Sequence, residues 1–204
     1  MKKQIIFDMD GTLIDSSAII ANSINHVRSR LGLPPMDPQT ILRAVNDPFI
    51  HRPRFFYGTE DYLPEHVEWF RDYYTRHHHA QTRLYPGIRE LLEELAPRYD
   101  LALATNAYRA SAEQILRHTG IAHYFGCIVC GDETEPKPSP KMLERIMERR
   151  GVKPSEAVMV GDGRTDEEAA KNAGVDFIRV DWGWEEHPDA VRSVAELRRR
   201  LLGA

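Results

Sequence analysis

The chain has 204 residues, of which 42% are hydrophobic and 28% are charged, and its net charge is −4. This composition is ordinary for a globular protein, and the acidic balance excludes a general electrostatic attraction to nucleic acid or anionic lipid. No apolar stretch approaches the roughly 20 residues of a membrane span, and the N-terminal sequence has no signal-peptide pattern, so we expect a cytoplasmic protein without nucleic-acid or membrane partners.

An apolar run near the N-terminus ends on two closely spaced carboxylates. Residues 5–7 are β-branched or aromatic and predict a short buried strand, after which Gly11 predicts a tight turn. Asp8 and Asp10 can therefore project toward one region at the carboxyl end of a strand, where open α/β sheets bind ligands. Close carboxylates repel each other, so the pair predicts a shared proton or a divalent metal. Taken alone, these residues are equally typical of a surface turn.

A helical module is predicted directly after this strand. Apolar residues recur with a 3.6-residue period over residues 16–32, and further helices are predicted over 38–45 and 64–78. Residues 46–58 break the pattern with prolines among basic and aromatic residues, which predicts irregular chain. Since no strand is predicted in this region, we interpret residues 16–84 as a helical domain inserted after the first strand.

Strands and helices alternate in the remainder of the chain. Strands are predicted at residues 101–105, 127–130, 157–160 and 177–180, with helices at about 88–95, 111–119, 139–150, 166–173 and 191–202. This alternation predicts an α/β fold built on a doubly wound parallel sheet. The catalytic core would then comprise residues 1–15 and 85–204.

Polar side chains follow the ends of these strands. They are Thr105 and Asn106 after the second strand, Lys137 after the third, and Asp162 and Asp166 after the fourth. The carboxyl ends of parallel strands meet at one edge of a sheet, so we expect these side chains to converge near Asp8. Phosphoryl transfer to a carboxylate needs a nucleophile, a proton donor, donors for the phosphoryl oxygens and cations. Each of these parts has a candidate here.

Four segments, in this order, resemble the motifs of the haloacid dehalogenase superfamily. They are Asp8-Met9-Asp10-Gly11-Thr12, Thr105-Asn106, Lys137-Pro138 and Gly161-Asp162-Gly163-Arg164-Thr165-Asp166. The resemblance covers essentially the whole chain. The helical insert is similar to the C1 cap of the phosphoglycolate phosphatase-like group.

The resemblance implies a Mg²⁺-dependent phosphatase acting on a small phosphorylated metabolite. By this resemblance Asp8 is the nucleophile that becomes an aspartyl-phosphate, and Asp10 protonates the leaving alcohol and later activates water. The residues implied to hold the phosphoryl oxygens are Thr105, Asn106 and Lys137. The ligands implied for Mg²⁺ are Asp8, the backbone carbonyl of Asp10 and Asp162, with Asp166 supporting them. Oxygen ligands of this kind suit Mg²⁺.

Other activities remain as alternatives. Dehalogenases of the superfamily lack the acid that Asp10 supplies, and a phosphonatase would need a cap lysine, whereas residues 16–84 contain none. A phosphosugar mutase differs mainly in how its cap excludes water and stays an alternative. From a different class, a non-catalytic phospho-binding or signalling module such as a receiver domain combines similar residues, but without a helical insert after its first strand.

Three arginines are candidates for substrate specificity. Arg52 and Arg54 lie in the stretch predicted to be irregular, and Arg109 follows the second strand of the core. Guanidinium groups bind carboxylates and phosphates well, so any of them could contact the substrate. For Arg109 the alternative is that it only covers the start of its helix.

Other titratable patterns are assigned to structure. Cys127 and Cys130 would face opposite sides of a strand, which favours two buried hydrophobic residues over a redox or zinc pair. Residues 77–79 are three consecutive histidines, which fan around a helix and predict a solvated face. Thr165 and Glu168 fit a capping box, so we assign Glu168 to the helix start and Asp166 to the site.

Overall fold

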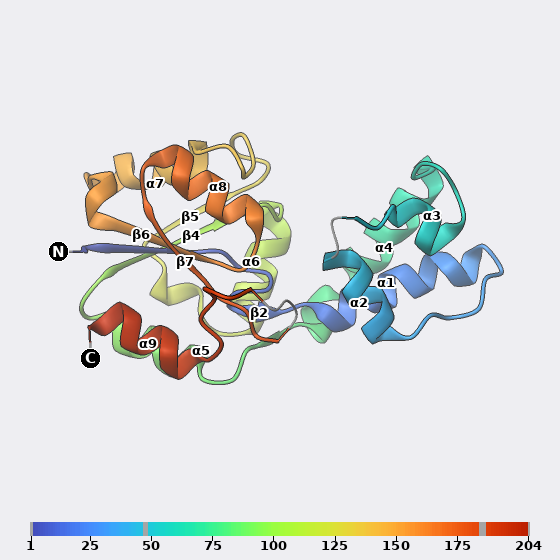
Figure 1. The fold of residues 1–204 in the computed structure, drawn as a ribbon, viewed down its shortest axis with the longest axis horizontal. Helices are drawn as coiled ribbons and strands as arrows, with labels where there is room; N and C mark the ends of the chain where they lie inside the picture. Colours follow the sequence, from blue (N-terminus) through green and yellow to red (C-terminus); the bar gives the residue numbers. More distant parts are fainter. Residues whose placement is uncertain (1, 47–48, 184–186, 204) are drawn as a thin grey trace. The chain divides into compact units, whose positions relative to one another are not determined.

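The computed structural model describes residues 2–46, 49–183 and 187–203. It divides into two compact units, one comprising Met1–Asp15 with Arg83–Ala204 and the other Ser16–Thr82 (Figure 1). Residues 47 and 48, which belong to the segment predicted to be irregular, lie outside the described residues. Among the described residues, no helix combines the length and apolar character that crossing a membrane requires.

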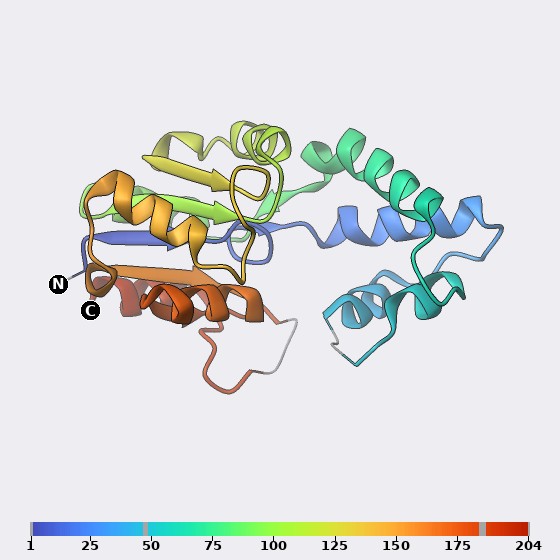
Figure 2. The same ribbon diagram turned by 90° about the horizontal axis from the view of Figure 1, so that it is seen from above.

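A five-stranded parallel sheet forms the centre of the first unit, with its strands side by side in Figure 2. In spatial order the strands are β5 (Cys127–Cys130), β4 (Asp100–Thr105), β1 (Gln4–Phe7), β6 (Ala157–Gly161) and β7 (Asp176–Arg179). The chain runs outward from β1 to β5 and then returns to the other side of β1. Strand order reverses at β1, so Asp8 leaves the sheet where doubly wound folds bind ligands. The predicted fold class is confirmed.

Helices cover both faces of this sheet (Figure 1). One face packs against α5 (Ile88–Leu95), α6 (Arg109–His118) and α9 (Val194–Leu202), and the other against α7 (Lys141–Arg150) and α8 (Arg164–Ala173). Two short 3₁₀ turns, η1 (Ala122–Tyr124) and η2 (Pro154–Glu156), precede β5 and β6.

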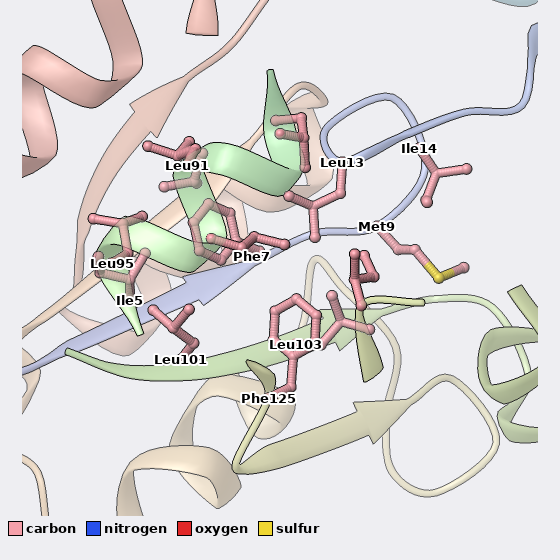
Figure 3. Close-up of a cluster of buried hydrophobic side chains, with 14 of the residues drawn as sticks. Ile5, Phe7, Met9, Leu13, Ile14, Leu91, Leu95, Leu101, Leu103 and Phe125 are labelled. Carbon is pink, nitrogen blue, oxygen red and sulfur yellow. The ribbon is translucent and has the colours of Figure 1, made fainter. Parts of the chain in front are cut away.

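Alternation along the strands supplies both layers of the core. Ile5 and Phe7 of β1 join the first cluster, which Figure 3 shows against Leu91 and Leu95 of α5, while Ile6 joins the second. Burying one such side chain fully contributes about 1.5–3 kcal/mol. This packing holds the end of β1, and therefore Asp8, in a fixed place.

The two cysteines obey the same alternation. Cys130 packs in the first cluster and Cys127 in the second, and both are free thiols. Their side chains therefore point to opposite faces of β5, and the prediction of two buried hydrophobic residues is confirmed.

A two-stranded antiparallel ribbon lies where the chain leaves and re-enters the first unit. It consists of β2 (Ile14–Asp15) and β3 (Arg83–Leu84). The prediction that residues 16–84 contain no strand is wrong for Arg83 and Leu84. A strand this short carries no hydrophobic period, so only its pairing partner reveals it.

The second unit is a bundle of helices with a core of its own. Its helices are α1 (Ser17–Arg30), α2 (Pro38–Asn46), α3 (Arg52–Tyr57) and α4 (Pro64–Gln81). The prediction of irregular chain is wrong for α3. Pro53 stands in the first turn, where a missing N–H breaks no helical hydrogen bond, and Phe56 is buried in the core of the bundle.

The three consecutive histidines do not share one environment. His77 and His79 are exposed, as predicted, but the prediction is wrong for His78, which is fully buried. Its Nδ1 lies 3.0 Å from the carbonyl oxygen of Thr75. Consecutive helical residues point in different directions, so the middle histidine turns inward while its neighbours face outward.

Candidate active site

A buried lysine joins two carboxylates at the carboxyl edge of the sheet. The Nζ of Lys137 lies 2.5 Å from Oδ1 of Asp8 and 2.5 Å from Oδ1 of Asp166. It also donates to the carbonyl oxygen of Ala104, at 2.8 Å. An ammonium group has three protons, and these three acceptors use all of them. Lys137 is thus a fixed internal cation, with 4% of its surface exposed.

Three carboxylates gather around this lysine. Asp8, Asp162 and Asp166 offer oxygen atoms that all lie within 4.8 Å of one another. Burial raises the pKa of the Asp162 carboxyl to about 7, helped by the charge of Asp166. Burial also raises the pKa of Asp8, although Lys137 opposes the shift. Burial alone would lower the pKa of Lys137, but Asp8 and Asp166 outweigh it and raise that pKa.

The donor set of this cluster fits a hard divalent cation. One lysine carries a single positive charge against three carboxylates, so the ionised cluster has an excess of negative charge that a cation would neutralise. Its ligand atoms are all oxygens, which is the chemistry of Mg²⁺ sites. A bound cation would also oppose the upward shift of these pKa values, because it stabilises the ionised carboxylates.

The turn after β1 brings the first motif against Asp162. Gly11 has φ +79°, and a Cβ atom there would stand 2.1 Å from Oδ2 of Asp162. The Oγ1 of Thr12 donates to Oδ1 of Asp162 at 3.3 Å. Asp10 lies half-buried in the same turn, where its backbone forms an isolated β-bridge with Ile14. Only glycine permits this close approach, which explains the residue type at position 11.

The side chain of Asn106 forms hydrogen bonds with both backbone groups of Lys137. Its Nδ2 donates to the carbonyl oxygen of Lys137 at 3.0 Å, and its Oδ1 accepts from the N–H of Lys137 at 2.8 Å. Asn106 was predicted among the phosphate-binding residues, and in the structure its side chain bonds the backbone of Lys137. Thr105 is buried beside it, and its Oγ1 accepts from the N–H of Ala107 at 3.1 Å.

The start of α8 differs from the predicted capping. Oδ2 of Asp166 accepts from the N–H of Gly163 at 3.0 Å, while its Oδ1 accepts from Lys137. Glu168 instead pairs with Arg164 at 2.7 Å. The assignment of the cap to Glu168 is therefore wrong, because α8 begins at Arg164 and its capping carboxylate is Asp166. That residue caps the helix and serves the cluster at once.

The three candidate specificity arginines fall in different environments. Arg109 donates to the carbonyl oxygen of Ile128 at 2.7 Å and pairs with Glu133, so its guanidinium is held against β5. Arg52 and Arg54 are exposed on α3 of the second unit. Arg54 makes a solvent-exposed contact with Glu60 at 3.6 Å. Exposed ion pairs of this kind contribute little to stability, so Arg54 could exchange Glu60 for an anion at little cost.

A fourth arginine at the sheet edge was missed in the sequence. Arg179 ends β7 with 9% of its surface exposed. Its Nη1 donates to the carbonyl oxygen of Asp162 at 2.6 Å. The available signal was a charge within the apolar strand at residues 177–180, where a side chain needs a buried partner.

Comparisons with known proteins agree on one family. The family model described as haloacid dehalogenase-like hydrolase matches residues 5–180. A protein named phosphoglycolate phosphatase from Chromobacterium violaceum is 35% identical, with 96% of this chain and 94% of that protein covered. Another of the same name from Vibrio parahaemolyticus is 36% identical, with 89% and 85% covered.

Solved structures give the same result. A predicted phosphatase from Clostridium acetobutylicum superposes with a TM-score of 0.82 at 25% identity, covering all of both chains. A haloacid dehalogenase-like hydrolase from Streptococcus pneumoniae superposes with a TM-score of 0.78 at 29% identity, covering 92% of this chain and 89% of that one.

Proposed function

Because the chain belongs to the haloacid dehalogenase-like hydrolase family and is a phosphatase, we propose that it hydrolyses a small phosphomonoester through an aspartyl-phosphate on Asp8, with Mg²⁺ as its cofactor. The observation that carries this proposal is the buried cluster of Asp8, Lys137, Asp162 and Asp166 at the carboxyl edge of the sheet. The cytoplasmic location and the domain roles assigned from the sequence stay predictions.

In the first step, a carboxylate oxygen of Asp8 attacks phosphorus and the bond from phosphorus to the alcohol oxygen breaks. Lys137 favours the ionised form of Asp8, which is the nucleophilic form. Asp10 gives its proton to the departing alkoxide, so the alcohol leaves neutral.

In the second step, water attacks the phosphorus of the aspartyl-phosphate. Asp10, now a carboxylate, takes a proton from this water, and the bond between phosphorus and Asp8 breaks to release inorganic phosphate. Thr105 and the backbone near Asn106 would donate to the phosphoryl oxygens. The side chain of Asn106 would act by keeping Lys137 in place.

The proposed ligands for Mg²⁺ are Asp8, the carbonyl oxygen of Asp10 and Asp162, with Asp166 holding Lys137 beside them. The cation would supply electrostatic stabilisation of the charge that develops on the phosphoryl group. Water binds well to Mg²⁺ and would complete its coordination.

The substrate is proposed to be a small phosphorylated metabolite. Phosphoglycolate is the first compound to test, because the similar proteins from C. violaceum and V. parahaemolyticus carry that name. Arg52 and Arg54 are the proposed contacts for a second anionic group of the substrate, since a guanidinium fork matches a carboxylate.

Phosphate release from a panel of phosphorylated metabolites, with Mg²⁺ and with EDTA, tests this function. Wild type should release phosphate only with the cation, and Asp8→Asn should release none. Asp100→Asn is the matched control. Asp100 lies at the amino end of β4, at the other end of the strand from Thr105, and pairs with Arg150. This variant should keep wild-type turnover. Transfer of phosphate between positions of a sugar phosphate, without release of inorganic phosphate, would favour the phosphosugar mutase activity over the proposed hydrolysis.

A further inference from the structure

Arg179 is a buried arginine with both of its terminal nitrogens engaged. Nη1 donates to the carbonyl oxygen of Asp162 at 2.6 Å, and Nη2 donates to Oε2 of Glu167 at 2.6 Å. The guanidinium carbon lies 5.7 Å from the ring centre of Phe177. Burying an arginine is costly unless its donors are satisfied, so these bonds fix its orientation.

The two residues that accept these bonds, Asp162 and Glu167, lie near the start and just after the end of the fourth motif. Asp162 directly follows β6, and Glu167 lies in the first turn of α8. The main chain of Arg179 pairs with Gly161 in the ladder between β6 and β7, and the N–H of Val180 donates to the carbonyl oxygen of Gly161 at 2.9 Å. Arg179 thus links the strand end, the turn and the helix start through both main chain and side chain.

The turn that Arg179 contacts connects directly to two carboxylates of the acidic cluster. At Gly161 a Cβ atom would stand 2.5 Å from Cβ of Asp166, so the turn already packs tightly against the helix start. Asp162 and Asp166 both belong to the acidic cluster, and their spacing depends on this turn. A change in the turn would move two carboxylates relative to Asp8.

We propose that Arg179 is a positioning residue that clamps residues 162–167 and so sets the placement of Asp162 and Asp166 for the cation. The role toward the cation rests on the proposed function, whereas the clamp itself does not. Only arginine offers two donors in a planar fork that reaches both acceptors. A lysine at this position could serve one acceptor at a time. Groups that orient metal ligands in this way typically change metal affinity about 10- to 100-fold when removed.

The test compares Arg179→Met and Arg179→Lys with two controls. Arg198→Met removes one positive charge and an exposed ion pair with Glu94 in the same unit, away from the cluster. Glu167→Gln keeps an oxygen acceptor for Nη2 and leaves the bond from Arg179 to the Asp162 carbonyl in place. Mn²⁺ serves as the probe, and its binding is followed by electron paramagnetic resonance of the free ion.

Both Arg179 variants should bind Mn²⁺ about tenfold or more weakly, while Arg198→Met binds as wild type and Glu167→Gln changes less than either. Hydrogen exchange in EDTA gives a readout that needs no metal. The N–H groups of Gly163 and Asp166, bonded to Asp166 Oδ2 and the Gly163 carbonyl oxygen respectively, should exchange faster in Arg179→Lys. The N–H of Asp8, bonded to Val160 at 2.9 Å, should exchange as in wild type.

Wild-type Mn²⁺ affinity and unchanged exchange in a folded Arg179→Lys would overturn the inference. Faster exchange at every site, including Asp8, would also overturn it, because it would show a general loss of stability. If wild type bound no Mn²⁺, the proposed cofactor would be wrong, and the exchange of Gly163 and Asp166 would still decide whether Arg179 acts as a clamp.

Discussion

Replacing Asp162 by Asn is expected to make the stability of the metal-free protein less sensitive to a rise in pH through neutrality, while removing its affinity for Mg²⁺. Without a cation, burial and the neighbouring Asp166 raise the pKa of Asp162 to about 7. An aspartate in an unfolded chain titrates near ~3.9. The folded state therefore holds this proton more tightly. The stabilisation that results is present at low pH and is lost as the pH rises through about 7.

Proton linkage gives the size of this effect. Between about pH 5.5 and about pH 8, a carboxyl with these folded and unfolded pKa values costs the folded state about 2 kcal/mol. Asn at position 162 carries no charge at either pH. The loss of unfolding free energy over this interval should therefore be about 2 kcal/mol smaller in Asp162→Asn than in wild type.

Urea denaturation in EDTA at both pH values measures this difference. Groups distant from position 162 titrate alike in the two proteins and cancel when the pH-induced losses are subtracted. Asp162→Asn also removes one cause of the raised pKa of Asp8, which changes the difference in the same direction. Equal losses in wild type and Asp162→Asn would refute the reasoning, because they would show that Asp162 does not hold an additional proton in the folded state.

Mg²⁺ should stabilise wild type but not Asp162→Asn. Saturating Mg²⁺ stabilises a protein that binds it only when folded, so wild type should gain stability and Asp162→Asn should not. The carboxylate must lose its proton to bind, so Mg²⁺ affinity should fall by up to about tenfold per pH unit below about 7. Calorimetry in two buffers of different ionisation enthalpy counts the protons released. A pH-independent affinity would contradict this assignment.

Three further predictions concern the turn, the lysine and the substrate. Gly11→Ala should abolish Mg²⁺ binding, because its Cβ would stand 2.1 Å from a cluster carboxylate, whereas Gly151→Ala, with a similar positive φ and open space, should cost stability only; equal Mg²⁺ affinities by calorimetry would contradict this. Asn106→Ala should lower the free energy of unfolding by about 1–3 kcal/mol in urea denaturation and reduce kcat, since two partly buried hydrogen bonds from this side chain to the backbone of Lys137 are lost. Unchanged values of both would remove its positioning role. Arg52→Ala and Arg54→Ala should raise KM with little change in kcat, and unchanged KM values in steady-state assays would end their candidacy as substrate contacts.

The sequence predicted the parts of the fold that depend on local periodicity. Alternating helices and strands predicted the sheet, and the apolar run at residues 5–7 predicted a buried strand, whose side chains the structure divides between the two faces. The end of β1 was predictable because two carboxylates and a glycine interrupt an apolar run. The parallel arrangement then placed Asp8 with residues more than 100 positions away, as the contact with Lys137 shows.

Features that depend on a partner in space escaped prediction. The role of the Asn106 side chain required the backbone of Lys137, which lies 31 positions along the chain. The clamp by Arg179 required the carbonyl oxygen of Asp162, and a backbone atom leaves no signature in a sequence. Helix α3 was not predicted because its six residues include two arginines and a proline and are too few to show an apolar period. Its apolar residues are recognised only by their packing in the core of the bundle.

Chemical trapping of the covalent intermediate tests the central claim most directly. Wild type is mixed with the best substrate and Mg²⁺, treated with borohydride to reduce the acyl-phosphate, digested and examined by mass spectrometry. We expect a reduced carboxyl at Asp8 that depends on both substrate and Mg²⁺. Rapid phosphate release with the modification absent from Asp8, or present on Asp10 instead, would contradict it.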